Sequence, residues 1–300
     1  MYIRPPFLKK NDRVAIVATA KNFDKEELAA AIQSFKSWGL EVVEGKWLYE
    51  KYHQFAGSDS ARKEDLQWAL DDSTIQAVFC ARGGYGTAKI IDTIDFKKML
   101  KHPKWVVGFS DVTVLHAQLQ VNKIQSIHGV MPILFGQKGY KLSIEKLRDV
   151  LFGKKSSYEI VSNKLNREGE ATGKLIGGNL SIICSLIGTS SEVNTKGKIL
   201  LLEDVGENLY RIDRMVVQLK RAGKLKVLAG LVVGHFTAIE DNKINFGKTA
   251  YEIIADAVKE YNYPVCFGFP AGHEADNLPL VLGAEQTLTV LKKAVFIKTN

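Results

Sequence analysis

The stretch KWVVGFSDVT, residues 104–113, decides how the first half of the chain folds. Its apolar run, residues 105–109, has the length and the bulky apolar side chains of a buried strand. Ser110 and Asp111 end this run, and a segment that we expect to be helical follows them. The stretch therefore predicts a sharp strand-to-helix junction at Ser110.

The same order of strand and helix repeats on both sides of this junction. Apolar runs of strand length alternate with stretches whose apolar residues recur at helical spacing. The expected strands are residues 13–19, 41–45, 75–81, 105–109 and 125–130, and the expected helices include residues 25–39 and 60–72. This alternation predicts a parallel, Rossmann-like sheet covered on both faces, with ligands at the carboxyl ends of its strands.

A polar segment separates the second half of the chain from the first. Residues 153–173 lack apolar periodicity, so we expect a linker between an N-terminal domain, residues 1–152, and a C-terminal domain, residues 174–300. Beyond the linker, strands and helices alternate again. The expected elements are strands at 198–205, 228–236 and 264–269, helices at 208–223 and 248–262, and a β-hairpin at 286–299. The predicted fold class is α/β, in two domains.

The chain carries an excess of basic residues, with a formal net charge of +8. The Lys and Arg residues are scattered and form no basic tract, and no known nucleic-acid-binding motif is present. We interpret the excess as a solvated basic surface or as a means of attracting anionic substrates. We expect no nucleic-acid partner.

The cysteines and the apolar runs bear on the compartment. Cys80, Cys184 and Cys266 lie far apart in apolar surroundings, which predicts buried free thiols in a reducing environment. The first residues contain no apolar segment of signal-peptide length, and no run approaches the roughly 18 apolar residues of a membrane span. We therefore expect a cytoplasmic protein with no membrane segment, and no cysteine or histidine spacing indicates a metal.

The expected third strand runs into a glycine-rich loop, ARGGYGTAK, residues 81–89. Glycines permit backbone conformations that other residues resist and leave amide N–H groups exposed, so such a loop before a helix can hold an anion. The spacing matches neither GxGxxG nor GxxxxGK[ST], which argues against a nucleotide phosphate. The alternatives are the oxyanion of an acyl-transfer reaction and a plain tight turn.

Ser110 is the candidate nucleophile. A serine at a sharp strand-to-helix junction exposes its Oγ beside the N–H of the next residue, which is the arrangement of a nucleophile elbow. Gly108 provides room two residues earlier, but Val112 stands where G-x-S-x-G enzymes have a second glycine, which disfavours an ordinary α/β-hydrolase. The alternative is that Ser110, followed by Asp111, caps a helix.

A serine nucleophile requires a base, and the sequence has six histidines. His273 lies in a loop of glycine, proline and asparagine directly after an expected strand, so its side chain can project over the end of the sheet. His235 ends another strand and is a rival for this role, and His128 could line the same cleft. The remaining histidines fit a structural or a loop position better: His53, His102 and His116.

The base in turn requires an acid that fixes its tautomer. Glu203 and Asp204 end the apolar run ILLLEDV, so one carboxylate is expected at the carboxyl edge of the sheet, although two acids also end ordinary strands. Ser110, Glu203 and His273 then follow one another along the chain in the order nucleophile, acid, base.

Six segments in order resemble the LD-carboxypeptidases, serine peptidases that include murein tetrapeptide carboxypeptidases and microcin immunity proteins. They are ARGGYGTAKIID, VVGFSDVTVLHAQL, HGVMP, GKLIGGNLSIICSLIGT, LLLEDVGENLYRIDRMVVQL and FGFPAGHEADNLPLVLG. The resemblance implies an N-terminal α/β domain with the nucleophile Ser110, a C-terminal α/β domain with the acid Glu203 and the base His273, and an active site between them. It also implies an oxyanion hole formed by the backbone amides of Gly84 and Asp111.

The resemblance further implies a reaction and its partners. It implies a homodimer that needs no metal or organic cofactor and that releases a terminal D-alanine from murein tetrapeptides during cell-wall recycling. The alternatives are a microcin-immunity-like peptidase or amidase that acts on a peptide conjugate, and a non-catalytic module that binds an anion or a nucleotide. The chain has Val130 and Glu274 where many relatives have proline and glycine, and these departures concern the shape of the substrate.

Overall fold

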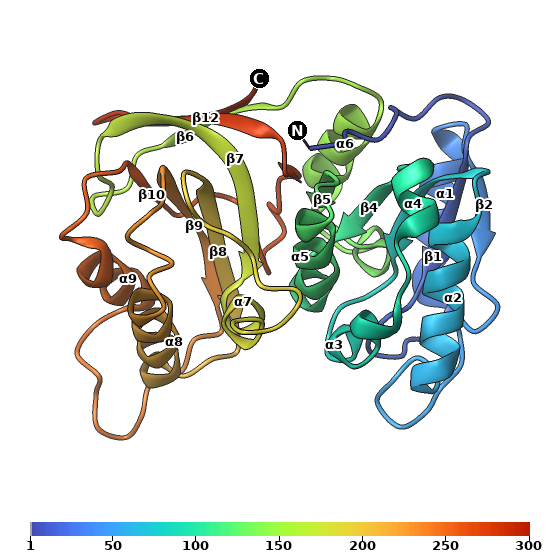
Figure 1. Ribbon diagram of the computed structural model, residues 1–300, viewed down its shortest axis with the longest axis horizontal. Coiled ribbons are helices and arrows are strands. Elements are labelled where there is room, and N and C mark those ends of the chain that lie inside the picture. Colours follow the sequence, from blue (N-terminus) through green and yellow to red (C-terminus); the bar gives the residue numbers. More distant parts are fainter. Residues whose placement is uncertain (1) are drawn as a thin grey trace. The chain divides into compact units, whose positions relative to one another are not determined.

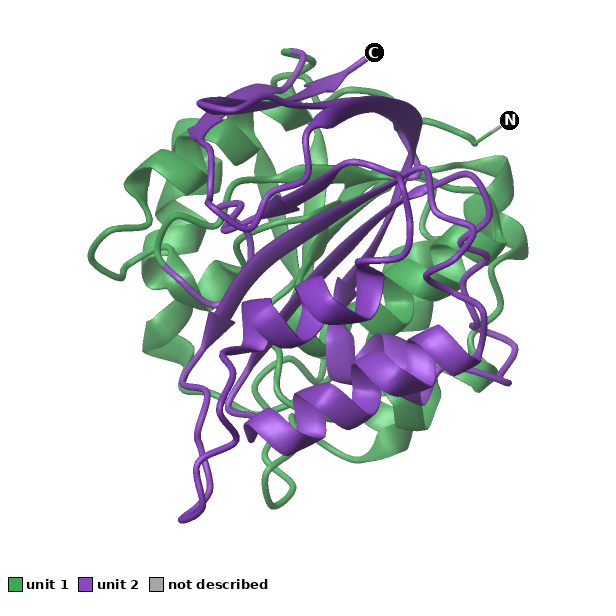
Figure 2. Cartoon of the chain, turned by 90° about the vertical axis from the view of Figure 1, so that its left-hand side faces the viewer, with its two compact units in different colours: residues 1–154, 275–282 green, residues 155–274, 283–300 purple. Residues whose placement is uncertain are grey.

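The structure is a computed structural model that describes residues 2–300 (Figures 1 and 2). The chain divides into two units, and each contains a sheet with parallel strands and helices packed on it. Unit 1 comprises Met1–Lys154 and Ala275–Leu282, and unit 2 comprises Lys155–Glu274 and Gly283–Asn300. This arrangement confirms the predicted α/β fold class.

Unit 1 is built on a six-stranded sheet with the strand order β11-β5-β4-β3-β1-β2. The strands β1 to β5 are parallel, as predicted, and β11 joins the edge antiparallel to β5. The residues of β4 are all buried, as expected of a parallel strand covered on both faces. The strands are β1 (Arg13–Val17), β2 (Glu41–Glu44), β3 (Ile75–Cys80), β4 (Trp105–Gly108), β5 (Ser126–His128) and β11 (Leu280–Leu282).

The helices of unit 1 begin at recognisable local signals. The helix α2 (Asp59–Asp71) is capped by Ser58, whose side chain accepts a hydrogen bond from the N–H of Ala61. This cap lies two residues before Ser60, where the sequence predicted the start of the helix. The other helical elements are η1 (Lys25–Leu28), α1 (Ala29–Ser37), α3 (Thr87–Ile90), η2 (Ile91–Thr93), α4 (Lys97–Lys101), η3 (Ser110–Val112), α5 (Thr113–Val121), η4 (Pro132–Leu134) and α6 (Lys141–Leu151).

Unit 2 is built on a seven-stranded mixed sheet with the order β10-β9-β8-β7-β12-β13-β6. This sheet has an antiparallel part and a parallel part, and the 11-residue strand β7 belongs to both (Figure 1). Its first half pairs antiparallel with β12, and its second half pairs parallel with β8. The predicted C-terminal hairpin is confirmed as β12 and β13. The strands are β6 (Ser157–Val161), β7 (Gly169–Asn179), β8 (Ile199–Val205), β9 (Gly230–Thr237), β10 (Val265–Phe267), β12 (Glu285–Val290) and β13 (Ala294–Thr299).

Two helices of unit 2, α8 (Leu209–Arg221) and α9 (Ala250–Val258), lie side by side on one face of this sheet (Figures 1 and 2). The apolar residues of α8 recur every three or four positions, so one stripe of the helix is buried. A reciprocal pair of hydrogen bonds between Thr249 and Glu252 caps the start of α9. The shorter helix α7 (Leu180–Ser185) begins directly after β7.

The segment for which the sequence predicted a linker, residues 153–173, contains regular structure. It includes β6 at the edge of the second sheet and the first residues of β7. This edge strand of five residues contains Tyr158, Ile160 and Val161, but it is short and only Tyr158 is buried. The chain passes from unit 1 to unit 2 between Lys154 and Lys155, and it returns to unit 1 for residues 275–282.

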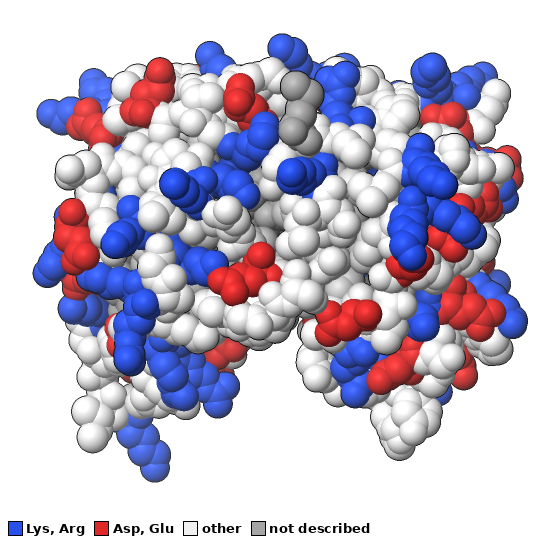
Figure 3. Space-filling view, in the orientation of Figure 1, with Lys and Arg blue, Asp and Glu red and all other residues white. Residues whose placement is uncertain are grey.

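Charge and cysteines follow the expectations. On the face shown in Figure 3, Lys and Arg side chains are spread over the surface with Asp and Glu side chains among them. The three cysteines are free and buried, as predicted. Over the range that the structure describes, no helix combines the length and the apolar composition needed to cross a membrane.

Candidate active site

Ser110 lies at the turn between β4 and η3. Its φ of 63° is in the left-handed region, which is strained for a residue with a side chain. Phe109, with extended backbone, holds the N-cap position of η3, so Ser110 does not cap the helix. The turn therefore has the strained conformation of a nucleophile elbow.

The elbow is in close contact with the glycine-rich loop. A Cβ atom on Gly83 would lie 3.0 Å from the Cβ and 3.2 Å from the Oγ of Ser110, so a side chain there would displace the serine. Val112, which stands in place of the second glycine of G-x-S-x-G, packs on Gly108, where an added Cβ would lie 2.9 Å from its Cγ2. The two glycines thus leave room for the elbow, Gly83 for the side chain of Ser110 and Gly108 for that of Val112.

The side chain of Asp111 joins the elbow to the same loop. The carboxylate is buried, and its Oδ2 accepts a hydrogen bond of 2.9 Å from the N–H of Thr87. Burial raises the pKa of Asp111, while the hydrogen bonds from the loop oppose this shift. The backbone amides of Gly84 and Asp111, predicted to form an oxyanion hole, belong to the two segments that this bond connects. This role of the Asp111 side chain is not apparent from the sequence, since nothing in the local pattern pairs residue 111 with residue 87.

In unit 2, Glu203 and His273 form a hydrogen-bonded pair. The Nδ1 atom of His273 lies 2.7 Å from Oε2 of Glu203, whose side chain is 0% exposed, while the imidazole is 19% exposed. A carboxylate accepts only from a protonated nitrogen, so the bond places a hydrogen on Nδ1 and leaves Nε2 as the ring nitrogen that Glu203 does not engage. A neutral imidazole in this tautomer is prepared to act as a general base.

Glycines also surround the acid. A Cβ on Gly272, which has a φ of 128°, would lie 3.0 Å from Oε2 of Glu203, and a Cβ on Gly234 would lie 3.3 Å from its Cβ. Side chains at either position would press on the carboxylate that holds His273. The loop before His273 and the strand β9 are therefore shaped around Glu203.

The neighbouring acid, Asp204, serves a different purpose. It accepts hydrogen bonds of 2.9 Å from Nδ2 of Asn179 and from the N–H groups of Ser181 and Val205, at the start of α7 and the end of β8. Burial is the main cause that raises its pKa to about 6. Successive side chains of a strand point to opposite faces, so only one of the two acids could face His273.

One of the remaining histidines, His235, also lies beside the Glu203–His273 pair, because a Cβ on Gly272 would be 3.3 Å from its Cβ and 3.0 Å from Oε2 of Glu203. His116 is fully buried between the carbonyl of Gly108 and the hydroxyl of Ser126, at 2.9 and 2.8 Å, and burial lowers its pKa to about 4. It supports the backbone before the elbow, as its predicted structural role requires. His128 is buried beside the ring of Phe109, with ring centroids 5.7 Å apart. The other three are His53 and His102, which are exposed, and His235, which is half-buried on β9.

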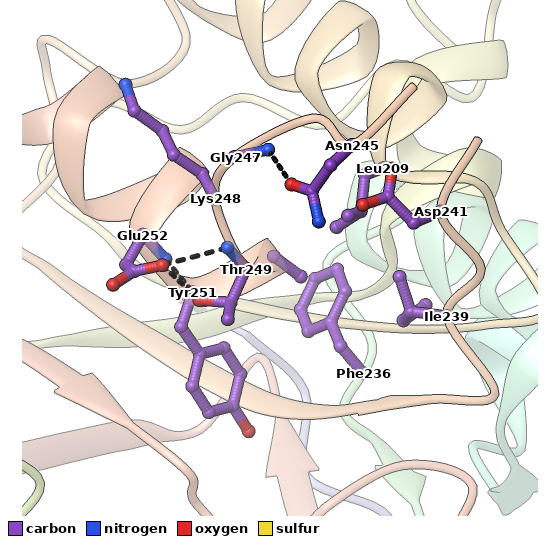
Figure 4. A pocket seen from close by; sticks show the side chains of 11 residues that line it. Leu209, Phe236, Ile239, Asp241, Asn245, Gly247, Lys248, Thr249, Tyr251 and Glu252 are labelled. Atoms are coloured by element: carbon purple, nitrogen blue, oxygen red, sulfur yellow. Dashed lines mark hydrogen bonds between the residues drawn. The ribbon is translucent and has the colours of Figure 1, made fainter. Parts of the chain in front are cut away.

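Unit 2 also contains a pocket of about 600 Å³ at the start of α9 (Figure 4). Apolar side chains, including Leu209, Phe236 and Ile239, line it. Tyr251, another lining residue, donates a hydrogen bond of 3.0 Å to the carbonyl of Gly234, the residue that also packs against Glu203. The strand β9 therefore contacts the pocket through Phe236 and Glu203 through Gly234.

A serine elbow and a buried Glu–His pair are features of serine hydrolases. Residues 14–129 match the model of the LD-carboxypeptidase N-terminal domain, and residues 172–288 match that of the LD-carboxypeptidase C-terminal domain. The chain is 33% identical to a protein of Bacillus subtilis described as a probable murein peptide carboxypeptidase, over 99% of this chain and 95% of that protein. The chain belongs to the LD-carboxypeptidase family, as its motifs predicted, and it is a carboxypeptidase.

Solved structures agree with this assignment. A muramoyltetrapeptide carboxypeptidase from Oxalobacter formigenes is 28% identical, with a TM-score of 0.88 over 96% of this chain and 98% of that one. The microcin C7 self-immunity protein MccF has a TM-score of 0.87 at 19% identity, over 100% of this chain and 98% of that one. At that identity the likeness to MccF concerns the fold alone.

Proposed function

We propose that this carboxypeptidase releases the terminal D-alanine of murein-derived tetrapeptides, with Ser110 as nucleophile, His273 as general base and Glu203 as the acid that orients the base. The observation that carries the proposal is the 2.7 Å bond between Glu203 and His273, because it prepares an imidazole for proton transfer. The names of the relatives, murein peptide and muramoyltetrapeptide carboxypeptidase, support the choice of substrate.

In the proposed reaction, His273 takes the proton of the Ser110 hydroxyl as Oγ attacks the scissile carbonyl carbon. The oxyanion that forms accepts hydrogen bonds from the backbone amides of Gly84 and Asp111, and each such donor contributes about 3 kcal/mol to transition-state stabilisation. His273 then protonates the departing amine of D-alanine, and an acyl-enzyme remains on Ser110. A water molecule, deprotonated by His273, hydrolyses the ester and restores the serine.

The test is a mass-spectrometric assay of murein tripeptide, tetrapeptide and pentapeptide with the wild type and with Ser110→Ala. We expect the wild type to convert tetrapeptide into tripeptide and free D-alanine, and the variant to remain folded and inactive. Undiminished release of D-alanine by Ser110→Ala would remove this residue from the mechanism. A wild type that cleaves only a peptide conjugate would favour the microcin-immunity alternative.

Covalent labelling distinguishes the enzyme from a non-catalytic binding module. A fluorophosphonate probe should modify Ser110 in the wild type and leave Ser110→Ala unlabelled, since the reagent requires an activated serine. Tight nucleotide binding without labelling would contradict the proposal. The homodimer implied by the resemblance and the cytoplasmic location expected from the cysteines and the apolar runs stay predictions, which sedimentation equilibrium and cell fractionation test.

A further inference from the structure

A carboxypeptidase must recognise the free carboxylate at the end of its substrate. That carboxylate belongs to the residue directly after the scissile bond, and one extended residue spans only about 3.3–3.6 Å. The group that binds it must therefore lie within about one residue of the carbonyl that the nucleophile attacks. If Ser110 attacks that carbonyl, the cation that binds the carboxylate should lie on the loops that contact the elbow.

Arg82 and Lys21 lie beside the glycines of the loop that contacts the elbow. Arg82 directly precedes Gly83, the residue in contact with the Ser110 side chain. Lys21, in the loop after β1, donates its backbone N–H to the carbonyl of Gly83 at 3.4 Å. Its side chain crosses Gly84, because a Cβ added there would lie 2.8 Å from the Cβ and 3.6 Å from the Cδ of Lys21. Both cations therefore sit beside the candidate oxyanion loop.

Neither of these two cations has a carboxylate partner in the part of the chain that the structure describes. Arg82, which is half-buried, donates from Nη1 to the carbonyl of Asn22 at 3.2 Å, and Lys21 is exposed. This bond occupies one of the five donors of the guanidinium. Nearby cations that do have carboxylate partners are Lys46 with Glu64, Lys51 with Asp24, and Arg62 and Lys89 with Asp59.

The pocket of unit 2 offers a contrast. The cation among its lining residues is Lys248, which bonds to Asp256 at 2.5 Å and whose side chain extends away from the apolar lining (Figure 4). Two carboxylates, Asp241 and Glu252, also line this pocket. Its charge therefore does not favour a terminal carboxylate, whereas the charge beside the elbow does.

We propose that Arg82, assisted by Lys21, binds the terminal carboxylate of the substrate and thereby makes the enzyme an exopeptidase; this inference rests on the proposed role of Ser110. The planar guanidinium of Arg82 can donate two parallel hydrogen bonds to a carboxylate, and its bond to Asn22 fixes its orientation. Lys21 adds a second positive charge, on a side chain that lies against Gly84. A peptide that continued past the scissile residue would have no negative charge to place there.

The experiment compares two substrates, a tetrapeptide that ends in D-alanine and the same peptide that ends in D-alanine amide. The wild type should prefer the acid, and Arg82→Gln should reduce kcat/KM for the acid about 10- to 100-fold, mainly through KM, with little change for the amide. Arg82→Lys should recover part of the preference, and Lys21→Gln should reduce it less than Arg82→Gln does. Lys89→Gln is the matched control, since it removes the same charge from a lysine paired with Asp59 at 3.5 Å.

The outcomes separate this inference from the proposed function. A wild type that does not release D-alanine from the tetrapeptide contradicts the proposed function itself. If the wild type is active but Arg82→Gln and Lys21→Gln keep its preference for the acid, the carboxylate is bound elsewhere and the inference is overturned. An equal loss on acid and amide would also overturn it, because a purely structural role affects both substrates alike.

Discussion

Unit 1 and unit 2 hold their candidate catalytic side chains by different means. In unit 1 the backbone places Ser110, through a φ of 63° and the contact with Gly83. In unit 2 a side-chain hydrogen bond places His273, through the buried carboxylate of Glu203. Substitution of the Ser110 side chain therefore leaves the turn in place, whereas loss of the Glu203 carboxylate releases the base. Tryptophan fluorescence reports on unit 1 alone, because all four tryptophans, Trp38, Trp47, Trp68 and Trp105, lie in it.

The largest expected effect comes from removing the side chains of the proposed nucleophile and the proposed base. Ser110→Ala and His273→Ala should each lower kcat by about 10⁴-fold or more, since each removes a step of the proton transfer. The double variant should be no slower than the worse single variant, because the serine and the histidine act as one unit. Rates of D-alanine release in single turnovers measure this. Losses that multiply in the double variant would show that the two units act independently.

The next effect concerns the acid alone. Glu203→Gln should lower kcat about 10³- to 10⁴-fold, because a neutral amide no longer fixes the Nδ1–H tautomer of His273. Its control is Asp204→Asn, one residue away, whose carboxylate faces the start of α7 and whose replacement should lower kcat less than about tenfold. Both values come from initial rates on the tetrapeptide. Equal losses in the two variants would mean that the bond between Glu203 and His273 has no special part in the reaction.

Asp204 should also make the stability of unit 2 depend on pH. Its pKa is raised from the ordinary 3.8 to about 6, mainly by burial, so the folded chain holds this proton more tightly than the unfolded chain. The free energy of unfolding therefore falls as the pH rises from about 4 to about 6, by up to about 3 kcal/mol from this residue. Urea unfolding of wild type and Asp204→Asn, followed by circular dichroism across this range, measures the difference. Identical pH slopes would contradict it.

The smallest effect tests the strain at the elbow. Ser110→Gly should stabilise unit 1 by about 1 kcal/mol, because glycine adopts a positive φ without the steric penalty of a Cβ. Ser110→Ala is the matched control, since it removes the hydroxyl and keeps the Cβ. Urea midpoints from tryptophan fluorescence report on unit 1. Equal midpoints for the glycine and alanine variants would show that the turn stores no strain.

Much of the fold was predictable because it depends on local patterns. The strand predicted at residues 198–205 is β8 (Ile199–Val205), and the hairpin predicted at the C-terminus is β12 and β13. A buried strand needs apolar residues along its own length, so a run of consecutive residues is enough to predict it. The strand-to-helix junction at Ser110 could be predicted for the same reason. The sequence did not show whether Ser110 has a positive φ, as in a nucleophile elbow, or caps the helix.

The features that the sequence left open all depend on residues far apart in the chain. The edge strand β6 lies in a segment without apolar periodicity, and β11 returns three residues, Leu280–Leu282, to the sheet of unit 1. The bond from Thr87 to Asp111 connects a loop with an elbow 24 residues away. Apolar periodicity does not predict such long-range contacts, because they form only after distant strands have paired.

The sequence by itself determined the α/β class, the alternation of strands and helices, and the candidates for a nucleophile, an acid and a base at the ends of strands. The residue pattern left Glu203 and Asp204 open and the family resemblance implied Glu203, whose bond to His273 the tertiary structure shows. Tertiary structure alone decided that Lys21 lies beside the glycine-rich loop. The reason is physical. Apolar periodicity depends on residues that are close in the sequence, whereas a hydrogen bond between two side chains forms only if both point toward each other. The packing of the whole unit sets those directions.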